Sequence, residues 1–209
     1  GIIVPSVIFL YTAQLVIEFA YQKQIVDFGK IGETTIFIIV CYGFGHILQS
    51  LGNIFENGLW FIYGGMPTKW LSKKNTFGNT LFDNVLNQKI LDKAKLKFGD
   101  GISDYGRLSY NLIFLKEKTA RIDIFNGNYS LFRGLSVSFL LITIMCGYFF
   151  SWQITALVTI PFFLSISRMI RFAKYYATET FRTFYNIELW RLKTEGQPIT
   201  FSRVDEKGP

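Results

Sequence analysis

The chain has 209 residues, enough for one or two soluble domains, but half of them are hydrophobic, 18% are aromatic and the mean hydropathy is +0.27. This composition argues against an ordinary soluble protein, and the net charge of +7 favours anionic partners, membrane surfaces among them. Two cysteines, Cys41 and Cys146, both lie in apolar runs, which indicates small buried thiols rather than a disulfide framework or a metal site.

Four apolar runs are long enough to cross a membrane, since roughly 20 mostly apolar residues span a hydrocarbon core about 30 Å thick. They are residues 2–21, a run that starts at Thr34, residues 130–150 and residues 152–167. Glu18 is the only charged residue in the first run, and Arg133 is the only one in the third. The first run also lacks the basic start and the cleavage site of a signal peptide. The sequence therefore predicts an all-α polytopic membrane protein with four transmembrane helices.

The charges between the runs predict how the chain crosses the membrane. Residues 22–33 are neutral and the turn near Ser151 is uncharged. Residues 66–130 carry eleven Lys and Arg against six Asp and Glu, and the chain from Arg168 onward carries eight against five. Because Lys and Arg near span ends favour the cytoplasmic side, we expect two transmembrane hairpins with both termini in the cytoplasm.

This organisation divides the chain into four parts. The hairpins occupy residues 1–65 and 130–167, a small helical cytoplasmic segment occupies residues 66–129, and residues 168–209 form a cytoplasmic extension of the fourth helix and a tail. The middle segment is too short to build a large core by itself. We therefore expect it to pack on the cytoplasmic ends of the spans or on a neighbouring subunit.

Apolar spacing predicts two helices in that segment. One covers residues 81–99, and the other runs from Tyr105 to Ser130 and leads into the third span. The predicted buried positions of the second helix are Ile113, Leu115, Ala120, Ile122 and Phe125.

The fourth helix is predicted to continue past the membrane as far as Gly196, because residues 167–196 contain no earlier proline or glycine. Three arginines and two residues between them follow helical spacing along one face: Arg168, Arg171, Tyr175, Thr178 and Arg182. Three lysines of the 81–99 helix add to this basic character: Lys93, Lys95 and Lys97. Such a surface suits an anionic nucleotide or oligonucleotide, with Tyr175 as a stacking surface. Contact with anionic lipid headgroups is the alternative interpretation.

The second span carries a row of polar residues at helical spacing: His46, Gln49, Asn53, Glu56 and Trp60. Gly45 and Gly52 lie beside this row, where small residues let another helix approach closely. Charged side chains near the bilayer centre cost about 2.5–3.5 kcal/mol and normally face a bundle interior or a wet cavity. In one hypothesis the row only hydrogen-bonds neighbouring helices. In the other, together with Glu18 of the first span, it lines a water-filled path or forms a gate.

The same residues carry a resemblance. The pattern Gly45-His46-x-x-Gln49-x-x-Gly52-Asn53-x-x-Glu56, followed by Gly64-Gly65-x-Pro67-Thr68, resembles a set of small bacterial four-span membrane proteins. Three further stretches match loosely: "VPSVIFLY", "RIDIFNGNYSLFRGL" and "RFAKYYATETFRTF". The chain is similar to membrane effectors of antiphage defence of the Hailong type. This resemblance implies an oligomeric, nucleotide-gated pore in the bacterial inner membrane that depolarises an infected cell. A homo-oligomer, with a tetramer favoured, is the expected assembly.

Two other functions stay open at this point. A transporter subunit would use His46 and Glu56 as proton or cation ligands, and a membrane anchor would tether a partner protein at the cytoplasmic face. We expect no enzyme activity, catalytic residue, metal or cofactor. His46 is the only histidine, and the chain contains no GxSxG, HExxH or P-loop motif.

Overall fold

The computed structural model describes residues 2–21 and 31–194. These residues form six α-helices and one 3-10 helix, with no strand among them. The elements are α1 (Ile3–Tyr21), α2 (Ile31–Ile62), the 3-10 helix η1 (Pro67–Leu71), α3 (Asn84–Phe98), α4 (Tyr105–Leu115), α5 (Ala120–Phe149) and α6 (Trp152–Thr194). Four of them, α1, α2, α5 and α6, are long and apolar enough to cross a membrane. The chain is therefore an all-α polytopic membrane protein, as predicted.

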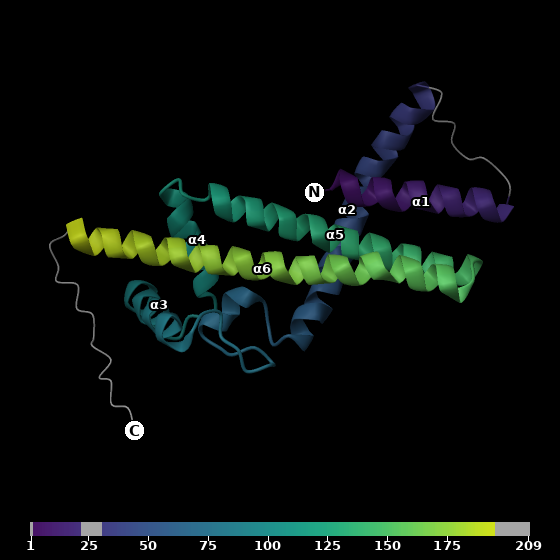
Figure 1. Ribbon diagram of the computed structural model, residues 1–209. Helices are drawn as coiled ribbons and strands as arrows, with labels where there is room; N and C mark the ends of the chain where they lie inside the picture. Colours follow the sequence, from purple (N-terminus) through teal and green to yellow (C-terminus); the bar gives the residue numbers. More distant parts are fainter. Residues whose placement is uncertain (1, 22–30, 195–209) are drawn as a thin grey trace.

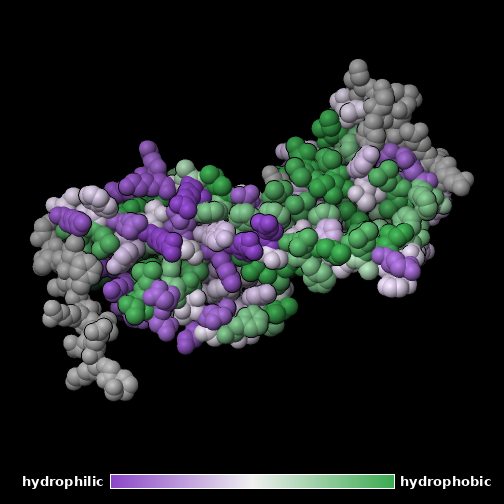
Figure 2. Space-filling view, viewed as in Figure 1, coloured by the Kyte–Doolittle hydropathy of each residue, from purple (hydrophilic) through white to green (hydrophobic). Residues whose placement is uncertain are grey.

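Two long antiparallel helices, α5 and α6, run through both halves of the molecule and are joined by a tight turn (Figure 1). α1 lies beside α5, and α2 crosses both α1 and α5 at a steep angle. Figure 2 shows hydrophobic side chains over the half of the molecule that holds α1 and the α5–α6 turn. Hydrophilic side chains predominate over the other half, which holds α3, α4 and the far end of α6. α6 thus runs out of the apolar half without interruption.

The second half, here called the polar body, consists of η1, α3, α4 and the adjoining ends of α5 and α6. Its helices start at capped positions: Asp83 accepts the Leu86 N–H before α3, and Asp104 accepts the Arg107 N–H before α4. The core is built around α6, whose Phe181 and Phe184 are fully buried. The other buried members of this core are Leu71, Phe82, Ile90, Ala94, Tyr105, Ile113 and Ile122. The segment 66–129 therefore packs on the extension of α6 within the same chain.

The prediction of one helix from Tyr105 to Ser130 is wrong. α4 ends at Leu115 and α5 begins at Ala120, with Glu117 in the left-handed region at φ 54° between them. The chain turns there because the charged sequence Lys-Glu-Lys offers no apolar side chain to bury. Folding back lets Ile113 and Ile122 enter the same core, whereas Leu115 and Ala120, predicted to be buried, are exposed.

A hydrogen bond closes this turn. The Tyr110 hydroxyl of α4 donates to the Asp123 carboxylate of α5 over 2.8 Å. The carboxylate holds the phenol proton and raises the pKa of Tyr110 to about 12. Because the folded pKa lies above the unfolded value, the stabilisation from this bond is complete below about pH 10 and is lost as the pH rises through about 12.

Within the apolar half the helices approach closely at glycines. A Cβ added to Gly45 would lie 2.7 Å from the Ile2 carbonyl oxygen, and one added to Gly134 of α5 would lie 2.9 Å from Pro5 Cγ of α1. The Ser138 hydroxyl, one turn further along α5, donates to the Pro5 carbonyl over 3.0 Å. These contacts seat the start of α1 between α2 and α5.

We expect Gly134→Ala to lower the thermal unfolding temperature of the detergent-solubilised protein, because the added Cβ would press on the rigid Pro5 ring. Overpacking of this kind costs about 1–3 kcal/mol. Gly127→Ala, on the same helix, is the matched control, since nothing beyond the adjoining backbone of α5 lies within 4 Å of the added Cβ. The control should unfold at the same temperature or slightly higher, because alanine favours a helix. Equal effects of the two substitutions would contradict this packing of α1 on α5.

Candidate functional site

A charged residue lies inside the third span. Arg133 is about 24 Å along α5 from Phe149 at ~1.5 Å per residue, within the reach of a hydrocarbon core about 30 Å thick. Its guanidinium donates to the Glu56 carboxylate and, over 2.9 Å, to Oε1 of Gln49, both on α2. The side chains of Arg133 and Glu56 are only 18% and 16% exposed. The charge is therefore neutralised and hydrogen-bonded within the chain, as a low-dielectric site requires.

Local geometry explains why α2 meets α5 at this point. A Cβ on Gly52 would lie 3.2 Å from Arg133 Cγ, so the arginine stem crosses α2 where that helix has no side chain. One turn earlier on α5, the Tyr129 hydroxyl accepts a hydrogen bond of 2.9 Å from Trp60 Nε1. The Arg133 guanidinium also lies 5.9 Å from the centroid of the Tyr129 ring. We call Gln49, Glu56, Trp60, Tyr129 and Arg133 the α2–α5 joint.

The predicted row on α2 is thus divided between two faces. Gln49, Glu56 and Trp60 turn toward α5, whereas His46 and Asn53 are exposed on the surface of the single chain. Ser50 and Asn57, which the sequence pattern missed, are also exposed and share the face of His46 and Asn53, since the four follow one another at intervals of four, three and four residues. We call His46, Ser50, Asn53 and Asn57 the outer polar row.

Each end of this row has a recognisable environment. The His46 ring packs edge-to-face against Tyr42, with ring centroids 5.0 Å apart. Asn57, with Glu56, lines a hollow of about 600 Å³ whose other lining residues include Lys69 and Asp104. Glu18 lies on α1 and accepts a hydrogen bond of 2.7 Å from Gln14 of its own helix.

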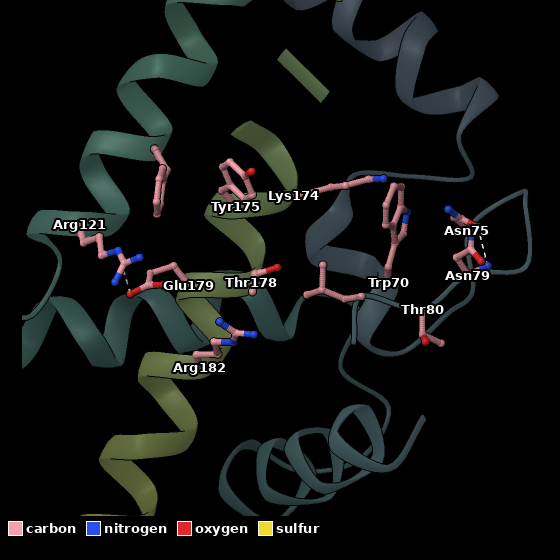
Figure 3. A pocket seen from close by; sticks show the side chains of 12 residues that line it. Trp70, Asn75, Asn79, Thr80, Arg121, Lys174, Tyr175, Thr178, Glu179 and Arg182 are labelled. Atoms are coloured by element: carbon pink, nitrogen blue, oxygen red, sulfur yellow. Dashed lines mark hydrogen bonds and ion pairs between the residues drawn. The ribbon is translucent and has the colours of Figure 1, made fainter. Parts of the chain in front are cut away.

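A second polar site lies in the polar body (Figure 3). Here α6 and the start of α5 face residues 70–81 across a cleft of about 520 Å³. Its basic side chains are Arg121 of α5 and Lys174 and Arg182 of α6. Lys174 Nζ lies 5.6 Å from the centroid of the Trp70 ring, and Arg121 lies 3.5 Å from the Glu179 carboxylate. We call this site the basic cleft.

The predicted ligand-binding residues fall in three places. Tyr175 and Arg182 line the basic cleft. Arg168 and Arg171 are exposed on α6 between the cleft and the apolar part of that helix. Lys93, Lys95 and Lys97 belong to α3, where Lys95 pairs with Asp100 over 3.4 Å and Lys97 with Glu188 over 3.5 Å.

Two basic residues of the cleft escaped the sequence analysis. Lys174, Thr178 and Arg182 follow one another at four-residue intervals on α6, and this spacing would have linked Lys174 to Arg182. Arg121 comes from α5, so no local pattern could have joined it to them. Among residues 2–21 and 31–194, no group of three or more His, Cys, Asp or Glu side chains is placed to hold a metal ion.

Comparison of the chain with protein-family models, with curated proteins and with solved structures gives no match. The fold and the sites define a four-span, all-α membrane protein with a polar body built on its longest helix. Its function has to be inferred from the α2–α5 joint, the outer polar row and the basic cleft.

We expect Arg133→Leu and Glu56→Leu each to destabilise the protein by about 3–5 kcal/mol, because each leaves one buried charge without its partner. The double variant should lose clearly less unfolding free energy than the two single variants lose together, since it removes both charges. Thermal unfolding in detergent of all three variants gives the coupling energy. Arg171→Leu, at an exposed position of α6, should change stability little. Simple additivity of the two single losses would show that the pair is not coupled.

Proposed function

We propose that this protein is an oligomeric channel of the bacterial inner membrane, with both termini in the cytoplasm, whose polar body senses an anionic ligand. The observation that carries the proposal is the outer polar row. His46, Ser50, Asn53 and Asn57 are exposed on a helix long and apolar enough to span the membrane. Such residues in spanning helices normally face protein or a water-filled cavity.

The dimensions of the row favour a path rather than an isolated contact. From His46 to Asn57 it extends about 16 Å at ~1.5 Å per residue, roughly half of a hydrocarbon core. No described part of the same chain covers it. A ring of copies with α2 toward the axis would place all four side chains against water and would need no further partner. Uncharged hydroxyl and amide groups along such a path would attract ions without holding them tightly.

The interior contacts supply a connection between the two sites. Trp70 lines the basic cleft, and its ring packs on that of Trp60 with centroids 6.3 Å apart. Trp60 in turn donates to Tyr129 within the α2–α5 joint. Trp60, Trp70, Tyr129, Met169 and Ala173 are buried together in one cluster. Buried side-chain contacts therefore connect the basic cleft to α2, the helix that carries the outer polar row, so a ligand that moved Trp70 would also press on that helix.

The setting is proposed from the resemblance to Hailong-type effectors, which supports antiphage defence, a nucleotide or oligonucleotide signal and a homo-oligomer. The geometry weighs against the transporter alternative. His46 and Glu56 lie on different sides of α2, and Glu56 is engaged by Arg133, so the two do not form a shared proton or cation site.

The test is ion flux through liposomes that contain the purified full chain, measured under an imposed membrane potential with and without ATP and a short oligodeoxynucleotide. We expect flux, and we expect symmetric rings in particle images of the detergent-solubilised protein. Asn53→Leu combined with Asn57→Leu should reduce flux by about tenfold or more, because leucines would close a wet path. Ile54→Leu, at an exposed neighbouring position, is the matched control and should conduct normally. A strictly monomeric particle without flux under every condition would overturn the channel.

A further inference from the structure

The basic residues of α6 lie at two different depths relative to the membrane. Arg168 is the first charged residue after the exposed apolar side chains Trp152, Ile154, Leu157, Ile160, Phe163 and Leu164. Counting from Trp152 at the start of α6, Arg168 and Arg171 lie about 24 and 28 Å along the helix axis at ~1.5 Å per residue, whereas Lys174 and Arg182 lie about 33 and 45 Å along it. The headgroup layer adds only about 5–8 Å on each side of the hydrocarbon core. Beyond a core of about 30 Å, lipid headgroups therefore account for Arg168 and Arg171 and come level with Lys174, but they do not reach Arg182.

The charges of the cleft are unbalanced. Arg121 is paired with Glu179, the only acidic residue of the lining. Lys174 and Arg182 have no carboxylate partner among the described residues. Each lies over the face of an aromatic ring, Lys174 over Trp70 and Arg182 over Phe82. Two cations that share one cleft without a counter-ion favour an anion between them.

The cleft also offers aromatic and neutral polar surface. Tyr175 is 46% exposed and lines the cleft together with Trp70 and Phe125. The ring centroids of Tyr175 and Phe125 are 5.6 Å apart. In Figure 3 Lys174 reaches toward Trp70, while Thr178 and Arg182 extend from the same helix into the space facing residues 70–80. Rings beside cations are the combination that binds a planar base next to phosphate. The volume of about 520 Å³ lies in the range of small-molecule sites.

We propose that the basic cleft binds a ligand with phosphate groups attached to a planar aromatic ring system, the chemistry of a nucleotide. Lys174 and Arg182 hold the phosphate, Tyr175 stacks on the ring, and Arg121 stays with Glu179 as part of the wall. This inference deepens the proposed function by assigning its sensing step to one cleft, and it separates that step from lipid contact.

The experiment measures binding of three probes to the full chain in discs of neutral phosphatidylcholine: ATP, adenosine and inorganic tripolyphosphate. We expect ATP to bind more tightly than either part alone. Lys174→Gln and Arg182→Gln should each weaken binding of ATP and of tripolyphosphate by about tenfold or more, as for loss of a charge-assisted contact. Tyr175→Leu should weaken ATP binding and leave tripolyphosphate binding unchanged. Arg182→Lys, which keeps the charge, should retain most of the affinity for tripolyphosphate.

Arg171→Gln is the matched control, because it removes the same charge from the same helix at the level of the headgroups. It should change ATP binding by less than about twofold. Equal weakening by Arg171→Gln and Arg182→Gln would reduce the effect to general surface charge and overturn the proposal. So would failure of the wild-type chain to bind ATP and tripolyphosphate. Unfolding temperatures equal to that of the wild type show that the variants are folded.

A repeat in discs that contain anionic phosphatidylglycerol distinguishes the two sources of phosphate. Unchanged ATP binding supports a free ligand, whereas competitive loss of binding that Lys174→Gln abolishes would assign the cleft to lipid and overturn the proposal. The outcome is separable from that of the channel. Binding without flux leaves the cleft assigned and removes the channel, and flux without binding does the reverse.

Discussion

The need to neutralise one guanidinium inside the membrane determines how the spans are arranged. Arg133 needs a carboxylate partner at this depth of the membrane, and Glu56 with Gln49 supplies that partner on α2. The arginine reaches them only because Gly52 leaves room for its stem. Once this face of α2 is held against α5, the helical repeat turns His46, Ser50, Asn53 and Asn57 away from the rest of the chain. The exposure of the outer polar row is thus a consequence of the α2–α5 joint.

The polar body is not an independent domain connected to the spans by a linker. Its core closes around Phe181 and Phe184, which belong to the helix that also forms the fourth span. Ile122 brings the start of α5 into the same core. Both helices of the second hairpin therefore continue from the apolar half into the polar body, and a rigid connection of this kind transmits displacement better than a flexible one.

The predictable parts of the fold are those that depend on the sequence of one helix alone. Long apolar runs gave four spans, and the absence of proline and glycine after Ser167 gave the long extension of α6. The break at Lys116–Thr119 was missed. Ile113 and Ile122 are nine residues apart and would lie on opposite sides of one continuous helix, and the turn is what brings both into the shared core. The basic cleft likewise draws on three segments that are remote in sequence, so helical spacing found Arg182 and Tyr175 but could not supply Arg121 or Trp70.

The division of the α2 row shows a more general limit. Helical spacing predicted that Gln49, Asn53 and Glu56 lie near one another around the helix. It did not predict which other helix each side chain would contact. That depends on Arg133, 77 residues after Glu56 in the chain. The single charge in the third span and the single acid at similar depth in the second were the available signal, since two opposite charges buried in one membrane seldom remain apart.

A ligand in the basic cleft can act on α2 only if the cleft differs between two arrangements of the chain, because a ligand shifts an equilibrium by its difference in affinity and by nothing else. The cleft has one wall on α6 and α5, which are long continuous helices, and another on residues 70–81, which follow α2. The link between α2 and that second wall contains Gly64 and Gly65, both at positive φ, and the Thr76 hydroxyl donates to the Ile62 carbonyl at the end of α2. Drawing residues 70–81 toward Lys174 and Arg182 would therefore pull on the end of α2 and on Trp60 through Trp70. In the proposed channel the α2–α5 joint would oppose this movement, and the strength of the Arg133 pair would then set how much binding free energy a ligand must supply to move the helix.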